Sequence, residues 1–324
     1  MDSATPAVYG GRAGSGISRS KLIALLYLVG VLSGFAAAIV HSIRSEGLWT
    51  ALGWAFGISI IDVAAAAVGV HLARQPSPTP LARIDYVAAG VFALLILMPP
   101  LAMSWPAGAA RAMTWAAVAG LAVYETGRNR RCPAAVAAAS LFVLLAGSVI
   151  LGRVAAQLFA GGMLLSWDAW LAAGLLDLLT DGRVQRSANV IITDHGSLLV
   201  TASCSSLRNV LYGLLCWLTV ARALRPEWQR GDLLAAVIVS AMVVAANTLR
   251  IALAGLSDTS YERFHGILGE NVFNLGLLVF TAAVAITTSR RPRPGPADQL
   301  TFQCSPSEAD RAREVPEAAS QPAR

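Results

Sequence analysis

The sequence predicts an all-α, polytopic membrane protein with about eight transmembrane helices, an interfacial helix and a small extracytoplasmic hairpin. Hydrophobic residues make up 56% of the 324-residue chain and charged residues only 14%, whereas a soluble domain is roughly one quarter charged. The apolar residues are gathered in runs of about 17–25, the length of helix that crosses a bilayer. Basic residues lie mainly between these runs, as in the loops of membrane proteins.

The apolar segments are predicted to be spans. They are residues 22–41, 50–72, 86–104, 112–125, 134–152, 208–224, 232–250 and 268–288. The polar and Pro-containing ends, 1–18 and 289–324, are predicted to be a disordered leader and a disordered cytoplasmic tail. Between them lie an N-terminal set of transmembrane helices, 19–152, and a second membrane region, 153–288.

The stretch at 155–179 is apolar enough for a ninth helix. However, Asp168 and Asp177 interrupt it, and a charge at the centre of a bilayer is costly. Trp167 and Trp170 suit the membrane interface, where indole rings prefer to lie. We expect a helix that lies on or dips into the membrane surface, with a ninth span as the alternative.

The residues that follow, 180–203, change character. Short β-prone runs at 189–193 and 197–201 flank the turn Asp194-His195-Gly196. This pattern predicts a small hairpin outside the membrane.

Loop charges predict the orientation of the spans. With the N-terminus in the cytoplasm, each inner connection carries more Arg and Lys than the outer connections beside it, apart from the long loop at 153–203. The positive-inside rule favours this arrangement, with both termini cytoplasmic. A full span at 155–179 would invert one half of the protein and put a basic cluster outside. We therefore expect a multi-pass protein of the cell membrane, a Gram-negative inner membrane by default, with the hairpin on the extracytoplasmic face.

Several classes of function are disfavoured. The net charge is +6, but no basic stripe with interleaved aromatic residues occurs, so no nucleic-acid partner is expected. The four cysteines form no CxxC pair and show no metal-ligand spacing. There is no HExxH motif, which argues against a zinc intramembrane protease. We expect neither a metal nor an organic cofactor.

Three reactive side chains, Cys204, Arg250 and His265, each fall at an end of an apolar segment or in a loop beside one. The predicted topology puts all three on the extracytoplasmic face. A thiol, a guanidinium and an imidazole together are the groups needed to cut or transfer an acyl group. We expect Cys204 to be the nucleophile and His265 the general acid and base.

Each of the three also has a structural interpretation. Cys204 lies among hydroxyl residues, four positions before Arg208, which would share its face on a helix and favour the thiolate; the alternative is a small buried residue that fills a gap. Arg250 follows Asn247 by one helical turn inside an apolar run, where an arginine indicates function; the alternative is a snorkelling anchor. His265 alone would be an ordinary surface histidine.

These motifs resemble those of the exosortase/archaeosortase family of membrane cysteine transpeptidases. The segment Ser203-Cys-Ser-Ser-Leu-Arg-Asn209 is similar to the family's A-C-S-G-L-R-S, and Asn247-Thr-Leu-Arg250 is similar to its N-x-x-R. His265 matches the family's histidine in the next loop, and residues 182–191 resemble its G-x-x-V-x-R-x-x-N-x-I. The resemblance covers about residues 155–288 in matching order. Serines at 203 and 206 replace the family's Ala and Gly, which indicates a divergent member.

The resemblance implies a reaction. Family members recognise exported proteins whose C-terminal sorting signal has a short motif, a membrane helix and a basic cluster, PEP-CTERM being the best-known type. It implies that Cys204 attacks the scissile carbonyl and that His265 transfers the proton to the leaving amine. Arg250 would stabilise the oxyanion, with Arg208 and Asn247 in supporting roles, and the thioacyl-enzyme would pass to an acceptor or to water.

Two other functions remain open from the residues alone. A multi-pass transporter would also place polar residues among membrane helices, although these usually lie at the midplane in paired halves. An inactive relative would bind the same exported proteins as an assembly factor. The intact Cys204, Arg250 and His265 favour the enzyme.

Overall fold

The computed structural model describes residues 18–53, 58–77, 79–101, 107–158, 163–180, 184–201 and 204–289. The predicted leader, except Ser18, and the predicted tail, except Ser289, lie outside these residues.

The described chain is mostly helical, as predicted, with 11 helices and one small sheet. The helices are α1 (Arg19–Glu46), α2 (Leu48–Gly53), α3 (Ile60–Ala73), α4 (Arg83–Leu101), α5 (Ala107–Arg128), α6 (Pro133–Leu158), α7 (Met163–Leu179), α8 (Ser206–Leu224), α9 (Arg230–Ala254), α10 (Asp258–His265) and α11 (Ile267–Ser289). The strands are β1 (Gln185–Ser187), β2 (Val190–Thr193) and β3 (Gly196–Leu199).

Four helical segments in the described residues are long and apolar enough to cross a membrane: α1, residues 133–151 of α6, α9, and residues 268–289 of α11. They indicate a multi-pass membrane protein. The prediction of one helix over 50–72 is wrong, because this segment contains the separate helices α2 and α3. Ser59 caps the new start at α3, where its side chain and that of Asp62 form a reciprocal capping box.

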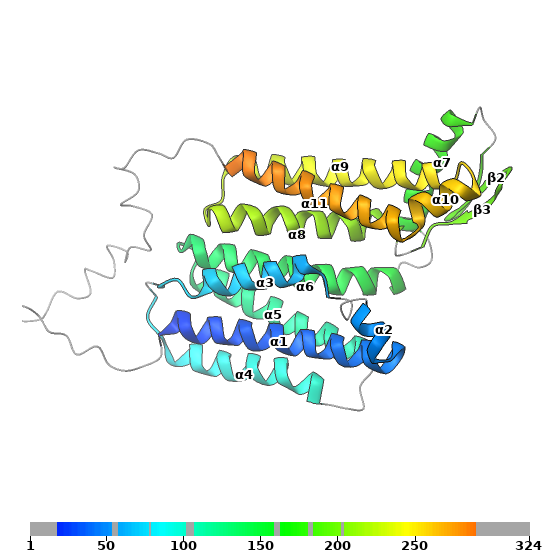
Figure 1. Ribbon diagram of the computed structural model, residues 1–324. Helices are drawn as coiled ribbons and strands as arrows, with labels where there is room; N and C mark the ends of the chain where they lie inside the picture. Colours follow the sequence, from blue (N-terminus) through cyan, green and yellow to red (C-terminus); the bar gives the residue numbers. More distant parts are fainter. Residues whose placement is uncertain are drawn as a thin grey trace, which may run out of the picture.

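The long helices run side by side in a bundle (Figure 1). Helices α1, α4 and α5 pack together on one side and α8, α9 and α11 on the other, with α3 and α6 between them. Helix α8 contacts α3 and α6 as well as α9 and α11, so it joins the two sets. One large apolar core runs through the bundle and includes the fully buried Trp115 and Phe142.

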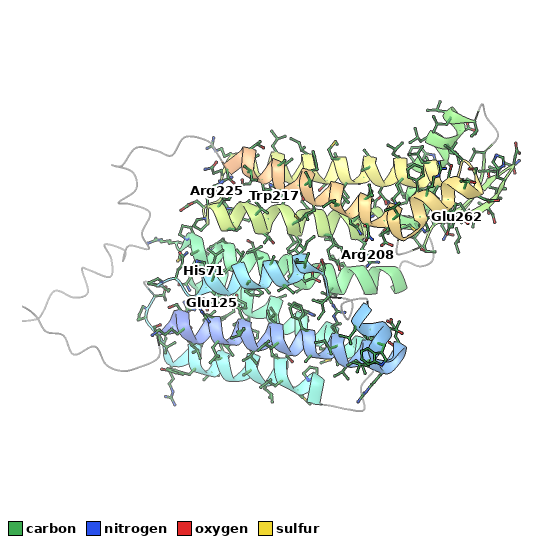
Figure 2. All side chains as sticks on the ribbon, viewed as in Figure 1. His71, Glu125, Arg208, Trp217, Arg225 and Glu262 are labelled. Atoms are coloured by element: carbon green, nitrogen blue, oxygen red, sulfur yellow. The ribbon has the colours of Figure 1, made fainter. Side chains whose placement is uncertain are left out.

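Buried ion pairs fasten one end of the bundle. Asp232 at the start of α9 accepts hydrogen bonds from both Arg222 and Arg225 at the end of α8. Arg19 of α1 donates to Glu125 of α5 over 2.6 Å. Figure 2 shows Arg225 and Glu125 at the end of the bundle opposite Glu262, which lies on α10. Because removing one partner would leave a buried charge unpaired, these contacts hold the helices in a defined register.

The other end carries α7, the sheet and α10 (Figure 1). The predicted hairpin is present as β2 and β3, which pair through Val190 with Leu199 and Thr193 with Gly196. A third strand, β1, adds to the other side of β2 and was not predicted. This end has its own small apolar core, in which Leu176 of α7, Ile191 of β2 and Ile251 of α9 pack around Cys204.

Close helix packing at glycines gives a test of this bundle. A Cβ added at Gly34 would lie 2.8 Å from the Trp115 ring, whereas one at Gly90 would meet nothing within 4 Å. We expect Gly34→Ala to lower the free energy of unfolding by about 1–3 kcal/mol, the usual cost of overpacking. Gly90→Ala should be neutral or slightly stabilising, because Ala is the better helix former. Equal effects in thermal unfolding of the purified proteins in detergent would contradict this packing.

Candidate functional site

Cys204 lies in a single turn just before α8. Its backbone N–H donates to the Thr201 carbonyl oxygen over 3.0 Å, and Ser205 then caps the helix by accepting from the Leu207 N–H. The side chain is only 4% exposed and belongs to the small apolar core under the sheet. The expectation that Cys204 shares a helix face with Arg208 is wrong, because α8 begins only at Ser206.

The thiol of Cys204 faces the imidazole of His265. The two residues are 61 positions apart, and the Sγ atom lies 3.3 Å from Nε2. His265 is the last residue of α10 and is half-buried, with the Tyr261 ring 5.0 Å away. This distance is within the reach of a hydrogen bond to sulfur, so a proton can pass directly between the two groups.

Two glycines fix the position of His265 between α10 and α11. Gly266 ends α10 by donating its N–H to the Glu262 carbonyl oxygen, and α11 begins at the next residue. A Cβ at Gly266 would lie 2.3 Å from that same oxygen, and one at Gly269 would lie 2.1 Å from the Arg263 carbonyl oxygen. Only glycine fits at either position. With glycine at both, α11 can begin directly after α10, and His265 lies at the junction of the two helices.

Arg250 approaches the other nitrogen of the same imidazole. One of its terminal nitrogens lies 3.5 Å from Nδ1 of His265, the outer limit of a hydrogen bond. Its guanidinium carbon lies 4.8 Å from the centre of the Phe273 ring, which supports it by a cation–π contact. Arginine has donors only, and at this distance it acts on the ring through its positive charge, while Nε2 is the nitrogen that faces the sulfur.

The surroundings of His265 shift the pKa of its imidazole. Burial lowers the pKa of the imidazole below its ordinary value, and the positive charge of Arg250 lowers it further, while Glu270 acts in the opposite direction. The histidine is therefore held in its neutral form at neutral pH, the form that accepts a proton.

Asn247 joins Cys204 to α9. Its fully buried amide donates to the Cys204 carbonyl oxygen over 2.8 Å and to the Ser206 hydroxyl over 3.0 Å. Its own oxygen accepts from the Asn209 amide over 3.0 Å. Both the nitrogen and the oxygen of the Asn247 amide are thus hydrogen-bonded. Because Arg250 lies one helical turn further along α9, the Asn-x-x-Arg spacing connects the cysteine and the arginine.

Asp168 is a site residue that the sequence did not reveal as one. Its buried carboxylate accepts from the Ser206 N–H over 2.9 Å and so caps α8 next to Cys204. The signal was present, because a charge inside an apolar segment needs a partner. The sequence does not say that this partner is a helix start 38 residues away.

Hydrogen bonds join the β1–β3 sheet region to the segment that precedes Cys204 and to α7. Asn189 and Val200 exchange hydrogen bonds of 2.9 Å, one from the Asn189 amide and one from the Val200 N–H. The Arg186 guanidinium donates to the Ser166 carbonyl oxygen of α7 over 3.4 Å. These residues of the 182–191 motif therefore have a structural role here; Gly182 and Arg183 of that motif, and Ser203 of the cysteine motif, lie outside the described residues.

Arg208 lies apart from this group. Its guanidinium carbon is 5.9 Å from the centre of the Tyr212 ring, and the side chain is exposed. Figure 2 shows it part-way along the bundle, between α8 and the layer of α3 and α6, and away from Glu262. The structure thus brings together four of the five predicted residues, Cys204, His265, Arg250 and Asn247, and directs the fifth elsewhere.

Comparison with known proteins finds no matching family model, no matching curated protein and no matching solved structure. Within the described ranges, His, Cys, Asp and Glu form no group of three or more that would hold a metal ion.

The arrangement around His265 predicts a charge effect. Arg250→Gln should raise the pKa of the imidazole, because it removes a positive charge that lowers it, while Arg250→Lys should keep the pKa low. An NMR titration of the purified protein measures this, and the chain has only four histidines to assign. At a pH just below the ordinary histidine value, Arg250→Gln should hold more imidazolium than the wild type. Identical titrations for Gln, Lys and Arg would show that Arg250 does not act on this ring.

Proposed function

We propose that this protein is a membrane-embedded cysteine protease or transpeptidase that cleaves the C-terminal sorting signals of exported proteins through a thioacyl-enzyme intermediate. The observation that carries the proposal is the 3.3 Å contact between Cys204 Sγ and His265 Nε2, with Arg250 on the other ring nitrogen. A nucleophile, a base beside it and a third group that orients the base are the components of covalent acyl transfer.

The first step forms the nucleophile. His265 Nε2 takes the proton of the Cys204 thiol, and the thiolate attacks the scissile carbonyl carbon. A carbon–sulfur bond forms and the electron pair of the carbonyl moves to its oxygen. Arg250, whose guanidinium lies 3.5 Å from the His265 ring, would stabilise this oxyanion.

The second step expels the amine. The oxyanion offsets the charge of Arg250 beside Nδ1, so the imidazolium becomes easier to form as the reaction proceeds. His265 then gives its Nε2 proton to the leaving nitrogen as the carbon–nitrogen bond breaks. An acceptor nucleophile or water attacks the thioester, and the same imidazole takes the proton from this attacking group.

The proposed topology has eight spans, cytoplasmic termini and the active site on the extracytoplasmic face of the inner membrane. Each of the eight apolar segments overlaps one of the helices α1, α3, α4, α5, α6, α8, α9 and α11, although α3 covers only the second part of its segment. Helix α7 begins at Met163 and is separate from α6, which favours the interfacial position over a ninth span. Its Trp167 and Trp170 are both more than half exposed, as expected for side chains at an interface.

The proposed substrates are exported proteins that reach the site within the lipid bilayer. The resemblance to exosortases and archaeosortases supports this substrate class through the cysteine, Asn-x-x-Arg and histidine motifs. Their residues Cys204, Asn247, Arg250 and His265 form one hydrogen-bonded group.

Replacement of the nucleophile tests the enzymatic function. In membranes of the native host, we expect Cys204→Ala and Cys204→Ser to leave C-terminal tails on exported proteins that end in a membrane helix and a basic cluster. Mass spectrometry of these proteins measures the tails, and removal should fall at least about a hundredfold, since nucleophile loss removes the covalent route. Cys216→Ala is the matched control, because Cys216 is another buried cysteine but lies nearly three turns inside α8.

Unchanged tail removal by a Cys204→Ala protein that is present at the wild-type level would refute the enzymatic proposal. It would favour the transporter or the inactive assembly factor.

A further inference from the structure

A second feature of the same end of the bundle is a cleft that shares Arg250 with the proposed catalytic group. It encloses about 490 Å³ between α3, α8 and α11, and Arg250 of α9 forms part of its wall. Ligand sites commonly enclose about 300–1,000 Å³. The cleft is therefore large enough for part of a small amphiphilic molecule.

One part of the cleft is positively charged. Arg208 and Arg250 both line it, and neither forms an ion pair with a carboxylate of the described residues. The Nε atom of Arg250 is buried and has no hydrogen-bond partner there. Glu270 is the single acidic residue that lines the cleft. Asp62 of α3 does not line it but interacts electrostatically with Arg208 and Arg111. The unused donor of Arg250 and the exposed guanidinium of Arg208 favour an anion with several oxygen atoms.

The remaining wall is apolar. It is lined by Gly213 and Cys216 of α8 and by Leu277 and Leu278 of α11. Its border carries exposed apolar side chains, among them Ile60, which is 79% exposed. An inorganic anion would occupy only the guanidinium region and leave this apolar wall without a partner.

We propose that the cleft binds an anionic phospholipid, with its phosphate between Arg208 and Arg250 and an acyl chain along α8 and α11. Charged and apolar walls in one cleft match the two parts of such a lipid. The cleft also lies among helices of a protein with membrane-spanning character, where lipids are the most abundant amphiphiles. This site goes beyond the proposed acyl transfer and does not depend on it.

The proposed lipid has a consequence for the neighbouring imidazole. A phosphate against Arg250 offsets the positive charge that lies 3.5 Å from His265 Nδ1. Since that charge lowers the pKa of His265, bound lipid should raise it. Occupancy of the cleft and the protonation state of the cysteine–histidine pair are therefore coupled.

Lipid binding to the purified full-length protein tests the proposal. Native mass spectrometry from detergent gives the affinity for phosphatidylglycerol, phosphatidylcholine and free glycerol phosphate as separate probes. We expect phosphatidylglycerol to bind about tenfold or more tightly than phosphatidylcholine, because the choline cation beside the phosphate of phosphatidylcholine repels the two guanidiniums. Free glycerol phosphate should bind far more weakly, since it lacks the apolar part.

Matched variants assign the binding to the cleft. Arg208→Gln should weaken phosphatidylglycerol binding about tenfold, whereas Arg263→Gln, at an exposed arginine of α10, should not. Leu275→Trp should fill the apolar part of the cleft and weaken binding. Its control is Val279→Trp, one turn along α11, because both residues are 60% exposed and only Leu275 lines the cleft.

Three results would overturn the proposal: equal affinity for the two phospholipids, glycerol phosphate binding as tightly as the lipid, or wild-type binding by both Arg208→Gln and Leu275→Trp. Selective binding of an acidic peptide without phosphatidylglycerol binding would assign the cleft to a protein substrate instead. Because the readout is binding, it gives the same answer whether or not Cys204 is a nucleophile.

Discussion

The buried amide of Asn247 is the contact on which the candidate site depends. It holds the Cys204 carbonyl and the Ser206 hydroxyl on one side of α9, and Arg250 leaves the same helix one turn later toward His265. A fully satisfied amide in an apolar interior is strongly oriented, because each unmade hydrogen bond costs about 1–3 kcal/mol. Cys204 and His265 are thus both positioned by contacts to α9, although they lie in different segments of the chain.

The two ends of the bundle differ in how they are stabilised. At one end, buried ion pairs around Asp232 and Glu125 lock the helices together. At the other end, a small apolar core under the sheet holds Cys204, and Asp168 caps α8 beside it. Apolar packing and a few hydrogen bonds therefore fix the position of Cys204 at this end of the bundle. The cleft lined by Arg208 and Arg250 adjoins this end.

The sequence predicted the helical class from local signals, and local signals also singled out the residues that the structure brings together. Apolar runs identify helices, and loop charges placed Cys204, Arg250 and His265 at the same face before any distance was known. The role of Asp168 and the need for glycine at 266 and 269 could not be predicted, because each depends on a backbone group brought close by the fold. The break before α3 has a local signal, the capping pair Ser59 and Asp62, but the apolar residues around it favoured one long span. The strand β1 has only three residues, and they carry no strong local pattern.

The most direct test of the central claim is to look for the acyl group on Cys204 itself. Protein purified rapidly from the native host membrane is digested, and the peptide containing Cys204 is analysed by mass spectrometry with and without neutral hydroxylamine, which cleaves thioesters. The account predicts a hydroxylamine-sensitive adduct whose mass matches a fragment of an exported protein ending at its cleavage site. It also predicts no such adduct on Cys216. Tail removal in the host without any acyl adduct on Cys204, or with an adduct on another residue, would contradict the assignment of Cys204 and His265 as nucleophile and base.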